Sequence, residues 1–310
     1  MNPPIREWRR ENAAWRGAAP ALSVLTPFKG DDPTELIGFL GASGLAVEII
    51  ALDDGGGDEA LARKVEGAIG KAGAPALFVR LAANVGRARA RNRLAREARG
   101  RHLLFLDADM RPDHAEFLAR WLEIARAEDP AVAFGGFTLT LAPRLAEHAL
   151  HRAMAIKGDC VPTERRRLAP EKHVFTSNLL VRREVFAAHP FDEAFSGWGW
   201  EDVEWAMRVS RRFPISHVDN TASHLGLETA DQIVAKFEQS AANFARVAAL
   251  HGDILATYPS HRAARILARL PFRGAWRGAL KAFALAPWAP THPRAAAMRL
   301  YRAALYADVV

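Results

Sequence analysis

Short apolar runs alternate with helical stretches through the first third of the chain, and this alternation constrains the fold more than any other feature. The runs cover residues 21–26, 47–52, 76–81 and 102–106, and they consist largely of β-branched, leucine and aromatic side chains. Such runs are typical of strands that are buried on both faces of a sheet. The β-α-β-α order therefore predicts an α/β fold with a mostly parallel, doubly wound sheet, in which ligands bind at the carboxyl ends of the strands.

Periodicity and capping patterns predict the remaining elements. Leu61, Val65 and Ile69 recur at helical spacing, and an arginine-rich helix is expected behind Gly86. Further along we expect a helix behind a capping box at Asp113 and Glu116, a strand over residues 174–182, a helix over residues 201–212, and a helix from a Thr229–Gln232 capping box to about His251, stopped by Gly252. Prolines are expected to break the last fifty residues into short helices.

Composition excludes several classes of protein. Half of the 310 residues are hydrophobic and a quarter are charged, which is the balance of an ordinary globular protein rather than of a disordered or fibrous one. The single cysteine, Cys160, rules out a disulfide framework and a cysteine-rich zinc module, so a metal ion would need oxygen or imidazole ligands. Neither a signal-peptide core nor an apolar run of about 18 residues is present. We expect a cytoplasmic location, with peripheral attachment to the inner face of the plasma membrane as an option.

The positive charge is concentrated at the carboxyl end. The whole chain has a net charge of +7, but residues 260–310 contain nine Lys and Arg and one acid, Asp308. A nucleic-acid-binding protein more often spreads its basic charge over the main domain, so nucleic acid is not expected as a partner. With Trp276, Phe283 and Trp288 among its short helices, this tail suits an anionic membrane surface. The alternative is that its aromatic residues pack on the domain while its arginines face water.

Two acidic clusters follow predicted strands. Asp107 and Asp109 lie directly behind the fourth strand, where alternate carboxylates in an extended turn can face one Mg²⁺ or Mn²⁺ ion. Taken alone, such a pair is as often simple turn chemistry. Asp53 and Asp54, in front of three glycines, can accept hydrogen bonds from a nucleoside, and Asp58 is expected only to cap a helix. Dinucleotide-binding and P-loop glycine patterns are absent, which disfavours both of those sites.

A third cluster, residues 197–202, has the sequence Gly-Trp-Gly-Trp-Glu-Asp and opens a helix. Its aromatic faces suit a sugar ring, and the helix dipole favours the charged form of both acids, so we expect Glu201 and Asp202 to be bases at neutral pH. The alternative is a pair of helix-stabilising acids beside core tryptophans. Seven arginines between residues 87 and 101 are expected to form mostly a solvated helix face, with one or two reaching a diphosphate. His224 alone is more often structural than a metal ligand.

In this order, the segments resemble the GT-A glycosyltransferases of family 2, in particular their galactosyltransferase-like and chondroitin-polymerase-type relatives. LSVLTPFKGD is similar to the family's first strand and nucleotide-contacting loop, and LLFLDADMRPD to its metal-binding Asp-x-Asp strand. VEIIALDDGGGD is similar to the Asp-Asp-Gly-Ser motif, with glycines in place of its Ser and Thr. Asn84, Gly86, Arg91 and Asn92 match a further family pattern. The resemblance implies donor contacts from Pro27, Phe28, Lys29, Asp53, Asp54, Arg91, Asn92 and Asp107.

The most diagnostic segment is FDEAFSGWGWEDVEWAMRV, which is similar to the Gly-Trp-Gly-x-Glu-Asp segment of β-galactosyltransferases. The resemblance implies that Asp202 is the catalytic base and that Glu201 holds an acceptor hydroxyl. It also implies acceptor contacts from Trp198, Gly199, Trp200 and Glu201. Because His224 falls where such relatives place a histidine ligand, the implied metal ligands for Mn²⁺ or Mg²⁺ are Asp107, Asp109 and His224.

The resemblance divides the chain into a leader (1–20), a catalytic domain (21–252) and a basic helical tail (253–310). The catalytic domain comprises a donor half, residues 21–112, and an acceptor half, residues 113–252. The implied activity is inverting, metal-dependent transfer of a sugar from a nucleoside-diphosphate donor, UDP by resemblance, to a hydroxyl of a glycan or glycolipid.

Two other functions remain open from the residues alone. A nucleotidyltransferase also binds a nucleotide with a Rossmann-like sheet and metal-binding aspartates, although it has no need of the tryptophan-rich segment. A non-catalytic protein that binds membrane surfaces would use the basic, tryptophan-containing tail. Metal-dependent hydrolysis of a UDP-sugar would exclude the second function, and turnover of CTP or UTP would favour the first.

Overall fold

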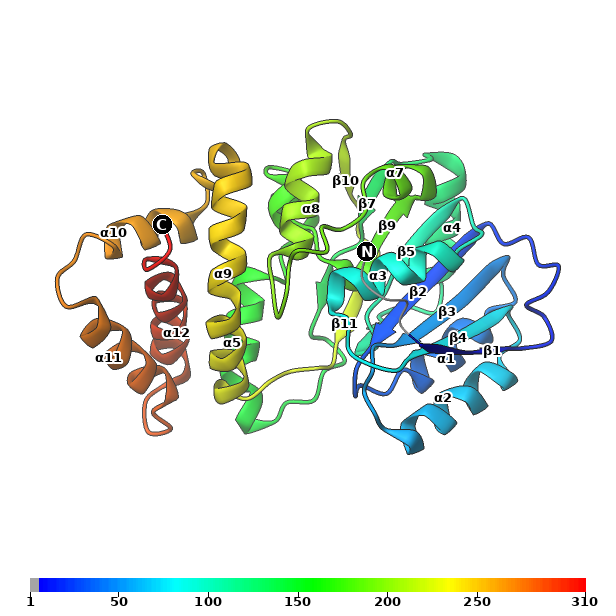
Figure 1. Ribbon diagram of the computed structural model, residues 1–310, viewed down its shortest axis with the longest axis horizontal. Coiled ribbons are helices and arrows are strands. Elements are labelled where there is room, and N and C mark those ends of the chain that lie inside the picture. The colour runs from blue at the N-terminus through cyan, green and yellow to red at the C-terminus, as the bar shows by residue number, and fades with distance from the viewer. Residues whose placement is uncertain (1–5) are drawn as a thin grey trace.

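A mixed sheet of eight strands runs through the described chain, residues 6–310 of the computed structural model (Figure 1). Strands β4, β3, β2 and β5 are mutually parallel, whereas β9 is antiparallel to both of its neighbours. The strand order is β1 (Glu7–Glu11), β4 (Ala76–Leu81), β3 (Val47–Asp53), β2 (Leu22–Phe28), β5 (His102–Phe105), β9 (Leu179–Arg182), β7 (Val132–Phe134) and β10 (Ile215–His217). The predicted α/β fold is confirmed, and its parallel core coincides with the four strands expected from the first third of the chain.

Strand β1 lies within the predicted leader of residues 1–20. Residues 1–5 of that leader are outside the described residues. Glu7–Glu11 pairs antiparallel with β4, and Trp15 is buried, with the guanidinium carbon of Arg99 3.8 Å from the centre of its ring. The described part of the leader is therefore joined to the domain by a sheet edge and a buried indole.

Helices cover both faces of the sheet, as the β-α-β-α order predicts. Alternate residues of each strand supply two cores: Val24 and Ile49 face one, and Leu25 and Ile50 face the other. The first core is closed by α1 (Thr34–Gly41), α2 (Glu59–Lys71) and α4 (Phe117–Ala127), and the second by α3 (Arg87–Glu97), α7 (Arg183–Ala188) and α8 (Glu201–Ser210). Asp58 caps α2 by accepting hydrogen bonds from the backbone of Ala60 and Leu61, as predicted.

A second, three-stranded sheet lies beside the first and consists of β6 (Met110–Pro112), β11 (Ala222–His224) and β8 (Phe137–Thr138). It corrects one expectation. Asp113 does not cap α4, because its carboxylate accepts hydrogen bonds from the hydroxyls of Thr138, Thr221 and Ser223. Asp113, which was expected to cap a helix, therefore links strands β8 and β11 of the small sheet through side-chain hydrogen bonds.

Short helical segments connect the acceptor half. They are α5 (Ala149–Gly158), α6 (Thr163–Arg166) and the 3₁₀ turns η1 (Ala146–His148), η2 (Pro170–His173) and η3 (Thr176–Asn178). The strand expected over residues 174–182 is shorter than predicted, because η3 occupies its first half.

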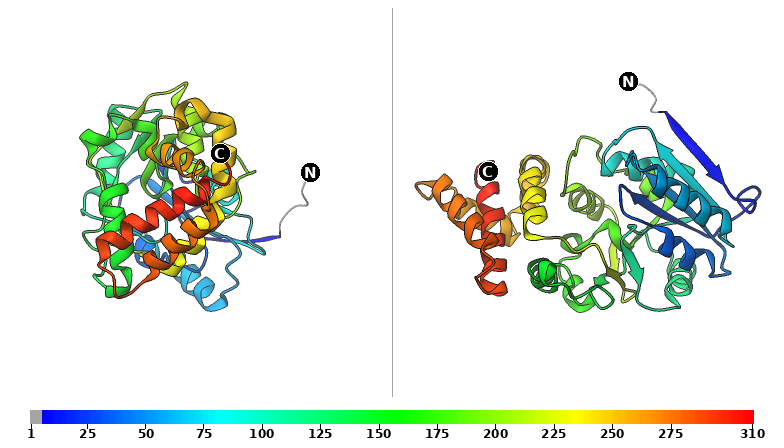
Figure 2. Two further views of the ribbon diagram at one scale, coloured as in Figure 1. Left: turned by 90° about the vertical axis from the view of Figure 1, so that its left-hand side faces the viewer. Right: turned by 90° about the horizontal axis from the view of Figure 1, so that it is seen from below.

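The carboxyl-terminal helices form a separate layer at one end of the molecule (Figures 1 and 2). They are α9 (Ala230–Leu255), α10 (Pro259–Leu267), α11 (Arg273–Leu285) and α12 (Thr291–Tyr306). The Thr229–Gln232 capping box is present, and the backbone is non-helical at His251, but the helix resumes and ends beyond Gly252. Helix α12 packs against α5 and α9 through Met298 and Tyr301. None of the helices in residues 6–310 combines the length and apolar character needed to cross a bilayer.

Candidate active site

Asp107 and Asp109 follow the carboxyl end of β5, at the sheet edge where the donor site is expected. The register of the small sheet then brings His224 to them. His224 pairs with Met110 across β11 and β6, and the backbone N–H of Leu225 donates to the carbonyl of Asp109 at 2.8 Å. His224 Nε2 consequently lies 3.0 Å from Asp109 Oδ2.

The Asp109–His224 contact is a hydrogen bond in partly buried surroundings, and it is an ion pair when His224 is protonated. Burial works against both charges, but the hydrogen bond between the two groups lowers the pKa of Asp109 and raises the pKa of His224. Gly226 is fitted to the same carboxylate, because a Cβ there would lie 2.1 Å from Asp109 Oδ2. No local sequence pattern indicates this role of Gly226, because it depends on a contact with a residue more than 100 positions earlier in the chain.

Arg91 lies between two predicted parts of the site, the carboxylates behind β5 and the acids that open α8. It is buried on α3, and its Nη2 donates to Asp107 Oδ1 at 2.9 Å while its Nη1 lies 3.5 Å from Glu201 Oε1. Burial opposes its charge, but Asp107 and Glu201 outweigh this and raise the pKa of Arg91. Its Nε and Nη1 have no hydrogen-bond acceptor in the described part of the chain. One or two of the seven arginines were expected to reach the donor site, and Arg91 is the one that meets Asp107.

Glu201 and Asp202 open α8 beside Arg91. Glu201 is buried, and its Oε1 also lies 3.9 Å from Nη1 of Arg87. Loss of water around the Asp202 carboxyl, together with the negative charge of Glu201, raises the pKa of Asp202 to about 7. The helix dipole was expected to favour the charged form of this acid, but burial and a like charge act in the opposite direction and outweigh the dipole.

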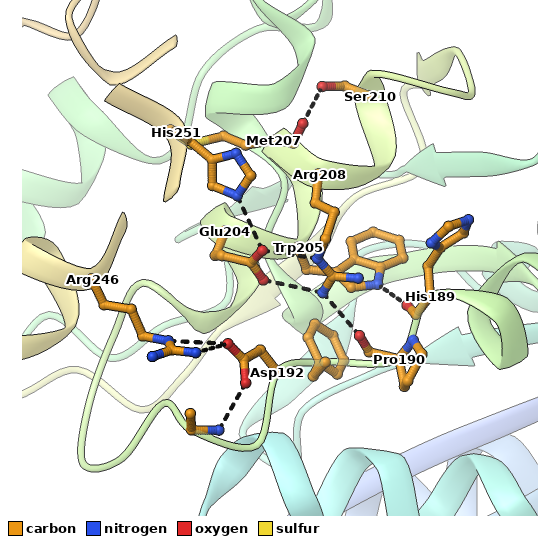
Figure 3. Close-up of polar contacts among 12 residues, drawn as sticks. His189, Pro190, Asp192, Glu204, Trp205, Met207, Arg208, Ser210, Arg246 and His251 are labelled. Carbon is orange, nitrogen blue, oxygen red and sulfur yellow. Dashed lines mark hydrogen bonds and ion pairs between the residues drawn. The ribbon is translucent and has the colours of Figure 1, made fainter. Parts of the chain in front are cut away.

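A polar network joins α8 to residues 189–190 and to α9 (Figure 3). Glu204 accepts hydrogen bonds from Arg208 and lies 3.1 Å from His251 Nε2, at the point where α9 departs from helical geometry. The indole of Trp205 donates to the carbonyl of His189 at 2.6 Å. These contacts set the position of α8, and with it the position of Glu201 and Asp202.

The loop in front of α8 is held by α9 and α12. Gly197 and Gly199 have φ angles of 70° and 88°, which other residues rarely adopt, and Asn243 donates to the carbonyl of Gly199 at 2.8 Å. Trp200 donates from its indole to the Tyr306 hydroxyl at 2.9 Å and packs on Phe244. Its ring therefore faces the helical layer, as in the core alternative that the sequence left open.

Trp198 takes a different direction from Trp200. It is partly exposed, its ring centre is 6.0 Å from that of Phe237, and Lys236 Nζ lies 5.6 Å from the ring centre. Trp200 is held by an indole hydrogen bond, whereas the Trp198 ring has only packing and cation–π contacts within the described residues. The acceptor contacts predicted for Trp198, Gly199 and Trp200 stay predictions.

The predicted donor loops are shaped largely by their own backbone. Asp54 accepts hydrogen bonds from the backbone of Val85 and Gly86, and Asp53 accepts one from Gly56. Burial raises the pKa of Asp54, against those hydrogen bonds. A Cβ on Gly55 would lie 2.3 Å from the backbone at residues 83–84, so this glycine permits the close approach that the motif predicted.

The other predicted donor residues differ in exposure. Phe28 is buried against Phe78, Pro27 is partly exposed, and Lys29 is exposed. Asn92 is buried, and its side-chain amide makes hydrogen bonds with both the N–H and the carbonyl of Phe191. Asn92 therefore links the predicted donor half to the segment that precedes residues 197–200, which are called the tryptophan loop below.

Two further ionisable side chains, Asp31 and His151, lie near Asp109 and His224. After burial, the charge of Asp109 is the strongest influence that raises the pKa of Asp31, just behind β2. Burial and the neighbouring His224 lower the pKa of His151 to about 4, and their ring centres are 5.9 Å apart. Asp31 was within reach of sequence reasoning because it follows a predicted strand, whereas His151 lies in an unrelated helix.

The donor set around Asp109 suits a hard divalent ion in its chemistry. Carboxylate oxygen and imidazole nitrogen are both ligands of Mn²⁺, and His224 already contacts Asp109. No three His, Cys, Asp or Glu side chains in residues 6–310 are gathered closely enough to hold a metal as they stand. Asp107 Oδ1 instead accepts a hydrogen bond from Arg91.

Residues 38–189 match the family model described as Glycosyl transferase family 2. This stretch, about half of the chain, is similar to a glycosyltransferase family 2 domain. This match, which spans Asp53, Arg91, Asp107 and Asp109, decides between the enzyme classes that the sequence left open, and the protein is a glycosyltransferase rather than a nucleotidyltransferase or a non-catalytic binding protein. No curated protein matches the glycosyltransferase in sequence.

Solved structures share the architecture of the glycosyltransferase. The mannosyltransferase PcManGT from Pyrobaculum calidifontis, in complex with GDP-Man and Mn²⁺, is 14% identical with a TM-score of 0.61, and the match covers 99% of this chain and 91% of that chain. TarS 1–349 from S. aureus is 16% identical with a TM-score of 0.48, over 91% of this chain and 89% of that chain. The first match confirms the GT-A fold, and the second is too distant to support an inference.

Proposed function

We propose that this glycosyltransferase moves a sugar, with inversion of its anomeric configuration, from a nucleoside-diphosphate donor to a hydroxyl of a glycan or glycolipid. The observation that carries the proposal is the bridge made by Arg91, which lies 2.9 Å from the donor-side Asp107 and 3.5 Å from Glu201, next to Asp202. Donor-binding and proton-accepting groups thereby meet at one buried cation.

In the proposed reaction Asp202 is the base. The acceptor oxygen forms a bond to the anomeric carbon as its proton passes to the Asp202 carboxylate, and the bond from that carbon to the diphosphate oxygen breaks with its electron pair leaving on the diphosphate. A pKa of about 7 leaves a useful fraction of Asp202 unprotonated at neutral pH while keeping it a strong enough base. Glu201, held by Arg91, is placed to orient the acceptor hydroxyl.

We assign the metal to Asp107, Asp109 and His224. When bound, Mn²⁺ or Mg²⁺ would neutralise the diphosphate as it leaves. The resemblance in sequence favours UDP as the nucleotide, whereas PcManGT was solved with GDP-Man, so both nucleotides belong in the test. The unused donors of Arg91 supply further positive hydrogen-bonding groups for an anionic ligand.

The test is release of nucleoside diphosphate from UDP-sugars and GDP-sugars by the purified protein, with and without Mn²⁺. We expect metal-dependent release from one nucleotide series and, with a glycan acceptor, a product of inverted configuration by NMR. Retention of configuration would contradict the assignment of Asp202, and metal-independent activity would contradict the metal assignment.

A further inference from the structure

The outer side of the carboxyl-terminal layer exposes large apolar side chains. Phe272 is 81% exposed, Trp276 is 56% exposed and Trp288 is 79% exposed. Helix α11 buries Ala284 against the layer and is held chiefly by α12, so its opposite side is free in the described chain. Figure 2 shows α10 and α11 as the outermost elements at this end of the molecule.

The exposed aromatic residues are continuous with one another. Trp276 and Phe283 are seven residues apart and share a face of α11. Phe272 directly precedes the helix, and the ring of Trp288 meets Phe283 edge to face with ring centres 6.1 Å apart. They form an apolar strip along the helix, in contrast to the scattered single hydrophobic residues of an ordinary protein surface.

A row of arginines lies on α10, the helix that precedes α11 in the chain. Arg262, Arg265 and Arg269 are exposed on α10 and just behind it, at the spacing of one helix face, and Ile266 lies on the same face. No carboxylate pairs with Arg265 or Arg269 within residues 6–310, whereas Arg277 forms an ion pair with Asp308. The docking face is defined as Arg262, Arg265, Ile266, Arg269, Leu270, Phe272, Trp276, Phe283 and Trp288.

The charge of this region selects among the surfaces that could cover it. A second copy of the chain would bring two regions of the same strong positive charge together, since residues 260–310 carry nine basic residues and one acid. A bilayer with anionic lipids complements both halves of the docking face. Tryptophan and phenylalanine insert at the headgroup boundary, and arginines next to them pair with lipid phosphates.

The aromatic residues of the tail thus fall into two groups. Trp276 and Trp288 are exposed, as the membrane alternative required, whereas Tyr301 and Tyr306, which neither alternative named, are buried in the layer. Deleting the whole tail would therefore remove core residues as well as the exposed ones. Point substitutions on the docking face separate the two roles.

We propose that the docking face binds the surface of an anionic lipid bilayer, with α11 lying along the membrane plane. This inference goes beyond the proposed function and does not depend on it. Because α12 also contacts Trp200 through Tyr306, docking would hold the acceptor half of the enzyme next to the lipid surface.

The test is co-sedimentation of the full-length protein with vesicles of phosphatidylcholine alone or mixed with phosphatidylglycerol. We expect binding to the mixed vesicles, weakening with added salt, and little binding to the neutral ones. Arg265→Glu with Arg269→Glu should lower the partition coefficient by roughly two orders of magnitude, and Trp276→Ala with Trp288→Ala by roughly one. All four side chains are exposed, so the melting temperatures should stay unchanged.

Matched variants lie on the far side of the molecule. Arg120→Glu with Arg126→Glu, on α4, makes the same change of charge, and Trp8→Ala removes an exposed tryptophan from β1. Both should bind mixed vesicles like the parent protein. The proposal would be overturned if the controls lost binding equally or if the parent protein did not bind vesicles. It would also be overturned if the parent protein formed a dimer instead of binding vesicles, and if Trp276→Ala with Trp288→Ala abolished that dimer. Release of nucleotide is measured separately, so failure of the proposed activity would leave this result interpretable.

Discussion

The predicted donor half and the predicted acceptor half of the site are built by different means. In the donor half, the carboxylates of Asp53 and Asp54 are held by backbone N–H groups of their own or the adjoining loop. In the acceptor half, the tryptophan loop is held by side chains of α9 and α12, such as Asn243 and Tyr306. One half is determined by short stretches of sequence and the other by helices that come much later, so a substitution should affect the two halves in separable ways.

The largest effect is expected in the donor half. Asp109→Ala should abolish transfer and weaken Mn²⁺-dependent donor binding, because a hard cation that loses one of few carboxylate ligands loses its hold on the diphosphate. Calorimetric titration of nucleoside diphosphate with and without Mn²⁺ measures this. His224→Ala should have a smaller effect, because water can take the vacant position. Asp58→Ala removes only a helix cap and serves as the control; full activity of Asp109→Ala would refute the metal assignment.

Asp202→Asn should impair only the catalytic function that we assign to the acceptor half. Turnover should fall roughly 10²- to 10⁴-fold, the range for a lost general base, while nucleotide and metal binding stay intact. Steady-state kinetics and the same titrations measure the two properties. Asp231→Asn makes the same chemical change at the first turn of α9 and should leave turnover unaltered. Equal loss of nucleotide binding and turnover in Asp202→Asn would mean that the two halves are not separable.

The pH profile sharpens the assignment of the base. Asp202 must be unprotonated to accept a proton, so kcat/KM should rise as the pH increases through about 7. Glu201→Gln removes the like charge that helps raise the pKa of Asp202, so the rising limb should move to lower pH, although burial still holds that pKa above the ordinary value for aspartate. A limb that stays in place in Glu201→Gln would show that another group titrates there.

The smallest effect is expected at the contact between Trp200, in front of α8, and Tyr306 of α12. Tyr306→Phe leaves the indole N–H of Trp200 without its acceptor, which should lower the free energy of unfolding by about 1–3 kcal/mol and raise the KM for the acceptor severalfold. Urea unfolding and acceptor kinetics measure these changes. Tyr301→Phe also loses a hydrogen bond, to Glu238, but does not contact the loop, and its KM should be unchanged. An equal KM in both variants would refute the role given to Tyr306.

The same difference between the halves explains what the sequence could predict. The four parallel strands and the caps Asp58 and Thr229 follow from patterns within a few residues, and the structure has them where they were expected. Trp200 could not be placed from its neighbours, because its partner Tyr306 lies 106 residues further along. The true partners of Asp113 could not be predicted either, because the hydroxyls that bind it come from β8 and from residues in and next to β11, far along the chain.

The electrostatics of Asp202 show a further limit of local reasoning. A helix N-terminus favours a carboxylate, and that rule alone predicts a charged group at neutral pH. The folded protein adds burial and the neighbouring Glu201, which act in the opposite direction and prevail. Neither the extent of burial nor the position of Arg91 could be derived before the fold was known.

The contact between Trp200 and Tyr306 also bears on the order in which the enzyme becomes competent during its synthesis. Chains emerge from the ribosome amino terminus first, and domains tend to fold in that order. The backbone groups that hold Asp53 and Asp54 come from residues no later than Gly86, so this part of the predicted donor site can form while most of the later chain is still being made. The tryptophan loop waits for α12, the last helix to emerge. A nascent chain that ends after α9 would contain the proposed nucleotide-binding residues but would lack Tyr306, which holds the tryptophan loop in position.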